Sequence, residues 1–168
     1  MEETTLQFPS DLKEILQRAN EIEAVKYNKT RNYLDGAVNH ISPYVTHGVL
    51  DLVELKNIAI SKFGEELSEG FISQLLWREY FQRVWQEKNV LENLRFEQQN
   101  VKHKDVPEKL INSKTEISVL DKAINGLYQH GYIHNHARMW IAALTCNFAH
   151  YHWKKPALWM YYHLLDGD

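Results

Sequence analysis

Apolar residues recur at helical spacing over the first half of the chain. They repeat every three or four positions over residues 12–22, and the same spacing returns after Asp51 and again after Ser68. Gly64 separates the last two stretches and is expected to end a helix before Ser68 begins the next. Ser42-Pro43 predicts a short helix, because proline at the first helical position gives up no needed N–H group.

The second half repeats the helical pattern after a polar segment. Residues 89–118 are polar and weakly periodic, which predicts a long connection. Three helices are expected beyond it, over residues 118–129, over residues 134–151 and from Pro156 onward. Glycine and proline are scarce, with 7 and 4 residues. Because no repeat, low-complexity tract or composition shift divides the chain, residues 1–168 are predicted to form one all-α domain.

Composition narrows the class of protein. Hydrophobic residues make up 44% and charged residues 24% of the 168 positions, as in ordinary globular domains. The formal net charge of −3 excludes a globally basic nucleic-acid-binding protein but allows a local basic patch. The single cysteine, Cys146, forbids an internal disulfide bond and indicates a reducing compartment. With no signal peptide and no apolar run of ~20 residues, we expect a cytoplasmic chain that does not enter a membrane.

One candidate site lies in the helix that follows Ser68. Gln74, Trp77 and Arg78 are spaced at i, i+3 and i+4, so they share one face of the helix. A flat indole beside a guanidinium suits a planar ligand or a phosphate. An amphipathic helix with a core tryptophan and a surface ion pair would give the same spacing. The spacing alone favours this second interpretation.

A second candidate site lies near the start of a later helix. Asn135 and Arg138 are i, i+3 neighbours there, where free N–H groups favour an anion. The alternative is a capping asparagine followed by a salt-bridged arginine. Asp166 and Asp168 are expected at the C-terminal end of the last helix, where the helix dipole disfavours carboxylates. Either they have a cationic partner or a polar ligand, or they are solvated terminal carboxylates. Arg138 is the candidate partner for one of them.

The histidines do not form a metal-ligand pattern. His150 and His152 are two residues apart, and so are His134 and His136, and such pairs diverge on a helix. No cysteine cluster or HExxH motif accompanies them. No metal site is therefore predicted.

Several segments, in this order, resemble the flavin-binding helical domain of the photolyase/cryptochrome family, from about Tyr27 to Asp168. They are Tyr27–Arg31 with Ile41–Tyr44, then Gln74–Phe81 (QLLWREYF), Leu120–Gly131, His134–Met139 (HNHARM) and Trp159–Asp168 (WMYYHLLDGD). The resemblance implies an all-α, multi-helix FAD-binding domain that is incomplete at its C-terminus.

The resemblance also implies a U-shaped FAD. Tyr27 and the turn at 39–42 would meet its pyrophosphate, while Asn135 and Arg138 would lie beside the isoalloxazine ring. Asp166 would pair with Arg138 near the ring, where a guanidinium stabilises a reduced, anionic flavin. Asp168 would bind the flavin edge or the ribityl and adenine side. The implied cofactor-binding set is Tyr27, Asn39, Ser42, Arg78, Asn135, Arg138, Asp166 and Asp168.

Further residues are implied in DNA repair. Trp77 and Gln74 would line the cavity that a DNA photoproduct enters, and Met139 would form part of its wall. Arg31 would contact DNA phosphates. Trp153 stands at the position of an electron-transfer tryptophan. The implied catalytic set is Gln74, Trp77, Arg138 and Trp153.

The chain also departs from the family pattern. The family's N-terminal α/β antenna domain is absent, and its phosphate turn Thr-Ser-Arg-Leu-Ser becomes residues 38–42, VNHIS. Gln74 stands where photolyases specific for cyclobutane dimers commonly carry glutamate. The sequence stops after Asp168, before the family's asparagine near flavin N5 and its flavin-proximal tryptophan.

Three hypotheses about function remain open. The first is a deoxyribodipyrimidine photo-lyase-like flavoprotein whose parent repairs pyrimidine photoproducts in damaged DNA with light, by electron transfer from reduced FAD. The second is a cryptochrome-like flavin module for light signalling without repair, which Gln74 favours. The third is a truncated helical module for interaction or metal binding that holds no flavin. On the first hypothesis too, this chain alone is not expected to be fully active. The uncovered last helix is consistent with either a homo-oligomer or a piece of a longer protein, and the second interpretation is favoured.

Overall fold

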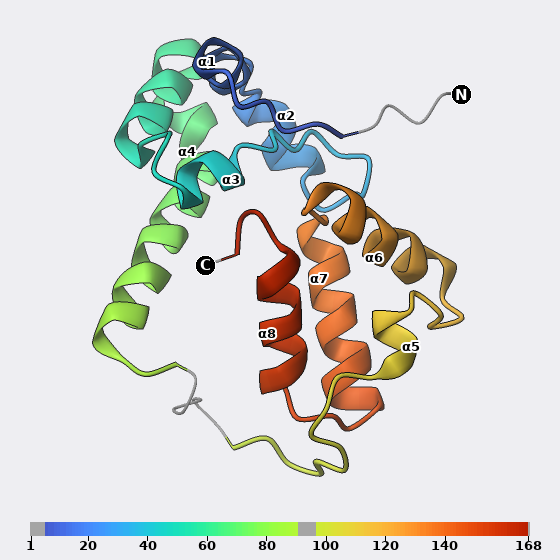
Figure 1. Cartoon of the computed structure of the whole chain (residues 1–168). Helices are drawn as coiled ribbons and strands as arrows, with labels where there is room; N and C mark the ends of the chain where they lie inside the picture. Colours follow the sequence, from blue (N-terminus) through green and yellow to red (C-terminus); the bar gives the residue numbers. More distant parts are fainter. Residues whose placement is uncertain (1–5, 91–96, 168) are drawn as a thin grey trace. The chain divides into compact units, whose positions relative to one another are not determined.

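The computed structural model describes residues 6–90 and 97–167, which form helices and connecting loops (Figure 1). Within these residues the only strand-like pairing is an isolated bridge between His103 and Tyr151. The all-α prediction is thus confirmed. The chain divides into two compact units, residues 1–89 (unit 1) and 90–168 (unit 2), and each is described by itself. The expectation of one domain over residues 1–168 stays a prediction.

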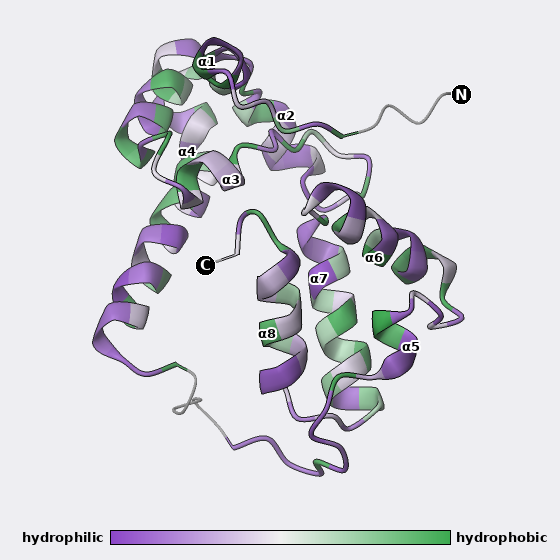
Figure 2. Cartoon of the chain, viewed as in Figure 1, coloured by the Kyte–Doolittle hydropathy of each residue, from purple (hydrophilic) through white to green (hydrophobic). Residues whose placement is uncertain are grey.

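Unit 1 is built on one long helix. Its helices are α1 (Leu12–Asn20), α2 (Ala24–Thr30), α3 (Ser42–Thr46) and α4 (Leu52–Glu87). Asp51 caps α4, because its carboxylate accepts hydrogen bonds from the N–H groups of Val53 (2.7 Å) and Glu54 (3.2 Å). In Figure 2, α4 shows alternating hydrophobic and hydrophilic bands, as expected for a helix with one apolar side.

The break in α4 lies where the sequence predicted it. Gly64 adopts φ 78° and ψ 168°, which only glycine reaches without strain, so the helical backbone is interrupted there. The helix resumes directly after Gly64, and the prediction that Ser68 begins a new helix is wrong. Ser68 is buried, and its hydroxyl donates to the carbonyl of Ala59 across the kink (3.0 Å). This hydrogen bond ties together the two halves of α4.

The core of unit 1 forms where α1, α2 and α4 meet. Each fully buried leucine or isoleucine in it contributes roughly 1.5–3 kcal/mol through removal of its surface from water. The buried apolar residues are Ile15, Ala19, Ile22, Ala24, Ile41, Tyr44, Leu50, Leu55, Ala59 and Phe71. This core holds the turn before α3 against α4, and that turn carries candidate ligand-binding residues.

Unit 2 packs shorter helices around its own core. They are α5 (Glu108–Ile111), α6 (Ser118–His130), α7 (Asn135–Ala142), the π-helix η1 (Ala143–Phe148) and α8 (Lys154–His163). Figure 2 colours the helix labelled α7 as hydrophobic over the part that continues into η1. Ile141 and Leu144 of this part pack in the core with Trp159 and Met160 of α8.

The helix expected over residues 134–151 is shorter and less regular than predicted. It begins at Asn135 as α7, widens into η1 and ends at Phe148. The chain then turns at His150, whose φ of 58° is left-handed and cannot continue a helix. Gly131 ends α6 with φ 66°, as a C-capping glycine should.

No helix among the described residues is long and apolar enough to cross a lipid bilayer.

Candidate functional site

Within unit 1, the turn before α3 carries two of the predicted phosphate-binding residues. Asn39 and Ser42 are both half-buried. The turn passes through His40, which takes a left-handed φ of 51°, and reaches the core at Ile41. The Asn39 side-chain nitrogen, Nδ2, is buried and has no hydrogen-bond partner among the described residues. A buried amide donor of this kind is a place where a ligand oxygen can bind.

Arg78 is connected to the same turn through Thr46. One terminal nitrogen of Arg78 donates to the Thr46 hydroxyl (2.5 Å), and that hydroxyl donates to the backbone carbonyl of Ser42 (3.0 Å). The kink at Gly64 lies between Arg78 and the start of α4. The structure thus links Arg78 to Ser42 through Thr46, and a ligand shared by the two residues stays a prediction.

Tyr27 lies in a partly buried position on α2. Its ring meets Phe71 edge-on, with 5.6 Å between the ring centroids. The Arg31 guanidinium lies 6.0 Å from the centroid of the Tyr27 ring. Burial raises the pKa of the Tyr27 phenol, and the nearby Arg31 partly offsets that rise. Tyr27 is therefore a neutral hydrogen-bonding group at physiological pH, which suits a position beside a phosphate.

Trp77 is not a core residue of unit 1. It is 54% exposed, stacks on Phe81 at 5.7 Å and meets Tyr80 edge-on at 5.7 Å. The alternative of a core tryptophan on an amphipathic helix is therefore wrong at this position. Gln74, one turn earlier, is half-buried. An exposed, pre-oriented indole of this kind offers a stacking surface for a planar ring.

In unit 2, Arg138 is held by three neighbours. A terminal nitrogen donates to both carboxylate oxygens of Asp166, at 2.7 and 2.8 Å, and Nε donates to the carbonyl of Ile133 at 3.0 Å. The guanidinium also lies over the Tyr132 ring, 5.5 Å from its centroid. The ion pair expected between Arg138 and Asp166 is thus present. Asp166 is only 5% exposed, so the pair is well shielded from water.

The start of α7 is capped differently from the sequence interpretation. His134, not Asn135, is the N-cap, and its Nδ1 accepts a hydrogen bond from the backbone N–H of His136 (3.2 Å). The alternative of a capping Asn135 is therefore wrong. The Asn135 amide instead contacts the sulfur of Met139 at 3.9 Å, and Met139 is 58% exposed. Asn135, Arg138 and Met139 thus come from one short helix.

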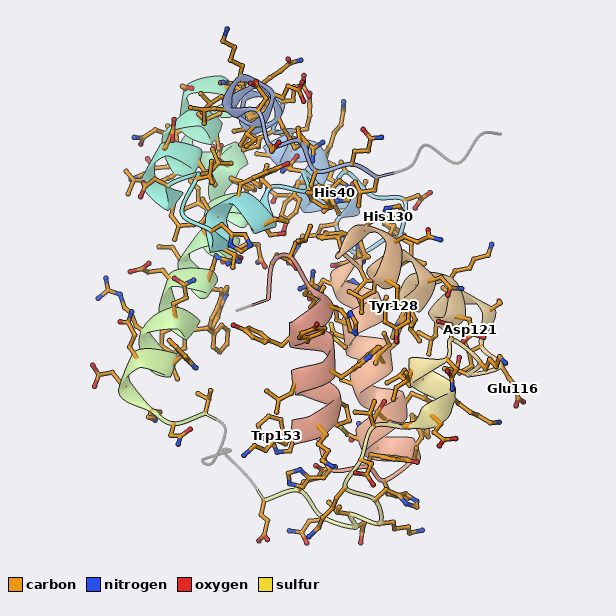
Figure 3. All side chains as sticks on the ribbon, viewed as in Figure 1. His40, Glu116, Asp121, Tyr128, His130 and Trp153 are labelled. Carbon is orange, nitrogen blue, oxygen red and sulfur yellow. The ribbon has the colours of Figure 1, made fainter. Side chains whose placement is uncertain are left out.

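The predicted electron-transfer residue, Trp153, lies at the start of α8. Trp153 is the N-cap of α8, at the end of the helix where Figure 3 labels it. It is half-buried and stacks on His152 with 6.0 Å between ring centroids. Its backbone N–H donates to the side chain of Gln98 (2.9 Å). Asp168 lies outside the described residues. Among those residues, no three His, Cys, Asp or Glu side chains gather as they would around a metal ion.

Sequence analysis missed the residues that position the arginines. Thr46 orients Arg78, and Tyr132 with the Ile133 carbonyl orients Arg138. The i, i+4 spacing of Ser42 and Thr46 was a usable signal, because a threonine hydroxyl in a helix commonly donates to the backbone carbonyl four residues earlier. Nothing in the pattern around Tyr132 pointed to Arg138.

Each unit by itself presents donors that suit one kind of ligand group. In unit 1, the unpartnered Asn39 amide nitrogen and the Arg78 guanidinium can bind phosphate oxygens. In unit 2, Asn135 and the fixed Arg138 offer an amide and a guanidinium, which match the oxygen- and nitrogen-bearing edge of a flavin.

Comparison with known proteins identifies related sequences and folds. The family model "FAD binding domain of DNA photolyase" matches residues 71–168. The deoxyribodipyrimidine photo-lyase of Vibrio cholerae serotype O1 is 28% identical over 153 residues, which cover 84% of this chain and 33% of that protein. The enzyme of the same name from Streptomyces griseus is 24% identical over 135 residues, covering 79% of this chain and 30% of that protein.

Two solved structures share the fold. A bacterial class III photolyase from Agrobacterium tumefaciens has a TM-score of 0.78 and 19% identity, covering 94% of this chain and 34% of that one. The Synechocystis sp. PCC6803 cryptochrome has a TM-score of 0.81 and 24% identity, covering 98% of this chain and 37% of that one. The chain spans about a third of the length of the curated relatives that it matches.

Proposed function

The chain belongs to the family of photolyase FAD-binding domains, whose cofactor is FAD, and we propose that it serves the light-driven repair of pyrimidine photoproducts in DNA. The observation that carries this proposal is the shielded ion pair between Arg138 and Asp166, which lies within the matched region. Such a pair holds the guanidinium in one orientation, which suits a position beside a flavin ring. The family match and the geometry of the arginine support the same assignment.

Arg138 can stabilise negative charge on a bound ring. Its contacts to Asp166, Ile133 and Tyr132 hold the guanidinium in place before any ligand arrives. Its second terminal nitrogen, Nη1, makes no hydrogen bond within residues 6–90 and 97–167, so it can donate to a ligand. A preorganised donor loses little entropy on binding and favours the charged form of its acceptor. FAD, when bound, supplies the light-absorbing ring and the electron for repair.

We assign the diphosphate of FAD to the unit 1 residues Asn39, Ser42 and Arg78, together with Tyr27 of α2. Asn39 supports this assignment with a direct test. Because its buried Nδ2 has no partner among the described residues, Asn39→Ala should leave the stability of the free chain unchanged or slightly raised while it weakens FAD binding. Equal FAD affinity in this variant would remove Asn39 from the phosphate site.

We assign the pyrimidine photoproduct, two linked neighbouring bases of one strand, to Trp77 and Gln74, with Met139 and Arg31 as further contacts to damaged DNA. The exposed indole of Trp77 is already held by Phe81 and Tyr80, so a flipped-out base can stack on it without reordering the side chain. A half-buried Gln74 offers both an amide donor and an acceptor to the edge of a base.

The lesion assignment can be tested with two tryptophans of the same helix. Trp77→Ala should weaken binding to an oligonucleotide with one thymine dimer by roughly 1–3 kcal/mol, the scale of one base stacked on an aromatic ring. Trp85 is 66% exposed on α4 and is the matched control, so Trp85→Ala should leave lesion affinity unchanged. Fluorescence anisotropy on damaged and undamaged duplexes measures both. An equal loss in the two variants would refute the assignment of Trp77.

A cryptochrome-like signalling role is the second candidate, and Gln74 favours it because it replaces the glutamate common in dimer-specific photolyases. The two roles differ in one observable. A FAD-loaded chain that responds to blue light but binds damaged and undamaged duplexes equally would support signalling rather than repair.

Self-association through α8 is part of the proposal. Tyr161 and Tyr162 are 58% and 83% exposed on this helix, and Leu158 is 43% exposed. An exposed apolar surface of this kind is typical of a contact between chains. Sedimentation velocity should show a dimer that Tyr162→Glu dissociates, and a monomer at all concentrations would contradict it.

A further inference from the structure

A cavity of about 910 Å³ in unit 2 is lined by none of the residues assigned above to FAD or to DNA. Most of its wall comes from residues 102–110 and from residues 144–151, which include the end of η1. Backbone hydrogen bonds join these segments: Lys102 N–H donates to the His150 carbonyl, and His152 N–H donates to the His103 carbonyl, both at 2.8 Å. The volume is in the range of pockets for small ligands, ~300–1,000 Å³.

The wall contains a buried polar side chain, Thr145. It is 2% exposed and lies in η1, and its backbone carbonyl accepts a hydrogen bond from Tyr151 N–H (3.0 Å). Its hydroxyl group is one of the polar groups of the cavity wall, and it can donate or accept a hydrogen bond. π-helices are frequent at functional sites. A polar atom of a ligand in the cavity can therefore bond to this hydroxyl.

The charges at the cavity leave an excess of cations. Two of the lining charges, Asp105 and Lys109, each form an ion pair of 2.5 Å with a residue outside the cavity. Lys102 and Lys104 form no ion pair within residues 6–90 and 97–167, and they face one remaining lining carboxylate, Glu108. The rim of the cavity therefore favours an anionic group.

The rest of the wall suits a ring. Tyr151 lines the cavity and lies against His103, with 4.6 Å between ring centroids and 31° between ring planes. Val106, Leu110 and Leu144 supply apolar surface beside it. A flat heterocycle can therefore lie on the aromatic pair or against the apolar wall, while an attached anion reaches the lysines.

We propose that this cavity binds a free nucleotide, with its heterocycle against Tyr151 and Leu144 and its phosphate bound by Lys102 and Lys104. Lysine binds phosphate as a mobile point charge, which suits a phosphate at the open rim. The Thr145 hydroxyl bonds a polar atom of the base or the sugar. This site is independent of FAD, because none of its residues belongs to the flavin sets.

The test is a titration of the full chain with AMP, followed by ¹H–¹⁵N NMR with and without saturating FAD. We expect resonance shifts confined to residues 102–110 and 144–151, unchanged by FAD. Adenosine and inorganic phosphate should each bind at least about tenfold more weakly than AMP, since each lacks one half of the recognised ligand.

Variants separate the cavity from general charge effects. The double reversal K102E/K104E should weaken AMP binding at least about tenfold, and T145V should weaken it about threefold. K114E/K122E makes the same change in charge within unit 2 but outside the cavity, so it should leave AMP affinity unchanged.

Several results would overturn the proposal. They are AMP-induced shifts that FAD abolishes, equal losses in the two double variants, and inorganic phosphate binding as tightly as AMP. Binding of a thymidine tetranucleotide without binding of AMP would also overturn it, because the site would then belong to a nucleic-acid strand.

Discussion

Replacing Asp166 by asparagine keeps the shape of the side chain and removes its charge. In the native chain, one Arg138 nitrogen contacts both carboxylate oxygens, at 2.7 and 2.8 Å. Hydrogen bonds to charged groups contribute about 1.5–3 kcal/mol each, and neutral ones about 1 kcal/mol. Asparagine retains one oxygen as a neutral acceptor and turns an N–H donor toward the guanidinium, so one contact weakens and the other is lost.

The position of Arg138 limits the penalty. Its side chain is 22% exposed, so water reaches part of the guanidinium, and Nε keeps its hydrogen bond to Ile133. The loss is therefore smaller than the 3–5 kcal/mol typical of a fully buried ion pair. We expect Asp166→Asn to lower the free energy of unfolding by about 2 kcal/mol.

Asp105→Asn is the matched control. Asp105 also pairs with a cation in unit 2, Lys155, at 2.5 Å, but the two side chains are 80% and 59% exposed. Because solvent screens such a pair, we expect no measurable change in stability. Urea unfolding followed by far-UV circular dichroism measures both variants, with comparison of midpoints at equal slope. Equal midpoints for the two variants would refute the claim that burial makes the Arg138–Asp166 pair important.

Three further predictions concern other parts of the chain. Burial raises the pKa of the Cys146 thiol, so iodoacetamide should alkylate it more slowly at pH 7.5 than free cysteine, with a rate profile moved to higher pH; a free-cysteine profile would contradict this. Hydrogen bonds from Thr115 lower the pKa of the Asp121 carboxyl, which lies near one end of α6 in Figure 3. The stabilisation from these bonds is present above the pKa of the unfolded chain and is lost as the pH falls through the pKa of the folded chain. Thr115→Val should raise the Asp121 pKa measured by NMR, and an unchanged titration midpoint would refute the role of Thr115. Gly131→Ala should destabilise the chain by roughly 1–2 kcal/mol, because alanine is strained at the left-handed φ of 66°. The loss should exceed that of Gly48→Ala (φ 70°), because a Cβ at Gly131 would lie 2.6 Å from a leucine carbon and one at Gly48 would meet open space. Equal thermal midpoints for the two variants would exclude the clash at Gly131.

The helices could be predicted because hydrophobic spacing reports directly on which side of a helix is buried. The breaks at Gly64 and Gly131 followed from glycine's access to positive φ. The π-helix could not be predicted, since Leu144 and Phe148 continue the α-helical spacing of the apolar residues before them. Widening of the turn there depends on packing with residues distant in the sequence.

The candidate site was predictable in part. The pairing of Arg138 with Asp166 followed from charge, because a carboxylate at a helix C-terminus needs a cation. The capping role of His134 did not, since histidine can accept a capping bond only through a neutral ring nitrogen and is rarely chosen for it. Likewise, Thr46 and Tyr132 act through contacts that only the folded backbone creates.

The most direct measurement is retention of FAD by the purified chain after desalting, read from the flavin absorption band and quantified by quenching of flavin fluorescence. We predict one FAD per chain, with Arg138→Ala and Arg78→Ala each losing most of it while far-UV circular dichroism stays native. The exposed Arg83, which pairs with Glu79 at 2.7 Å, is the matched arginine, and Arg83→Ala should retain FAD fully. A folded native chain that retains no flavin and shows no fluorescence quenching would contradict the account.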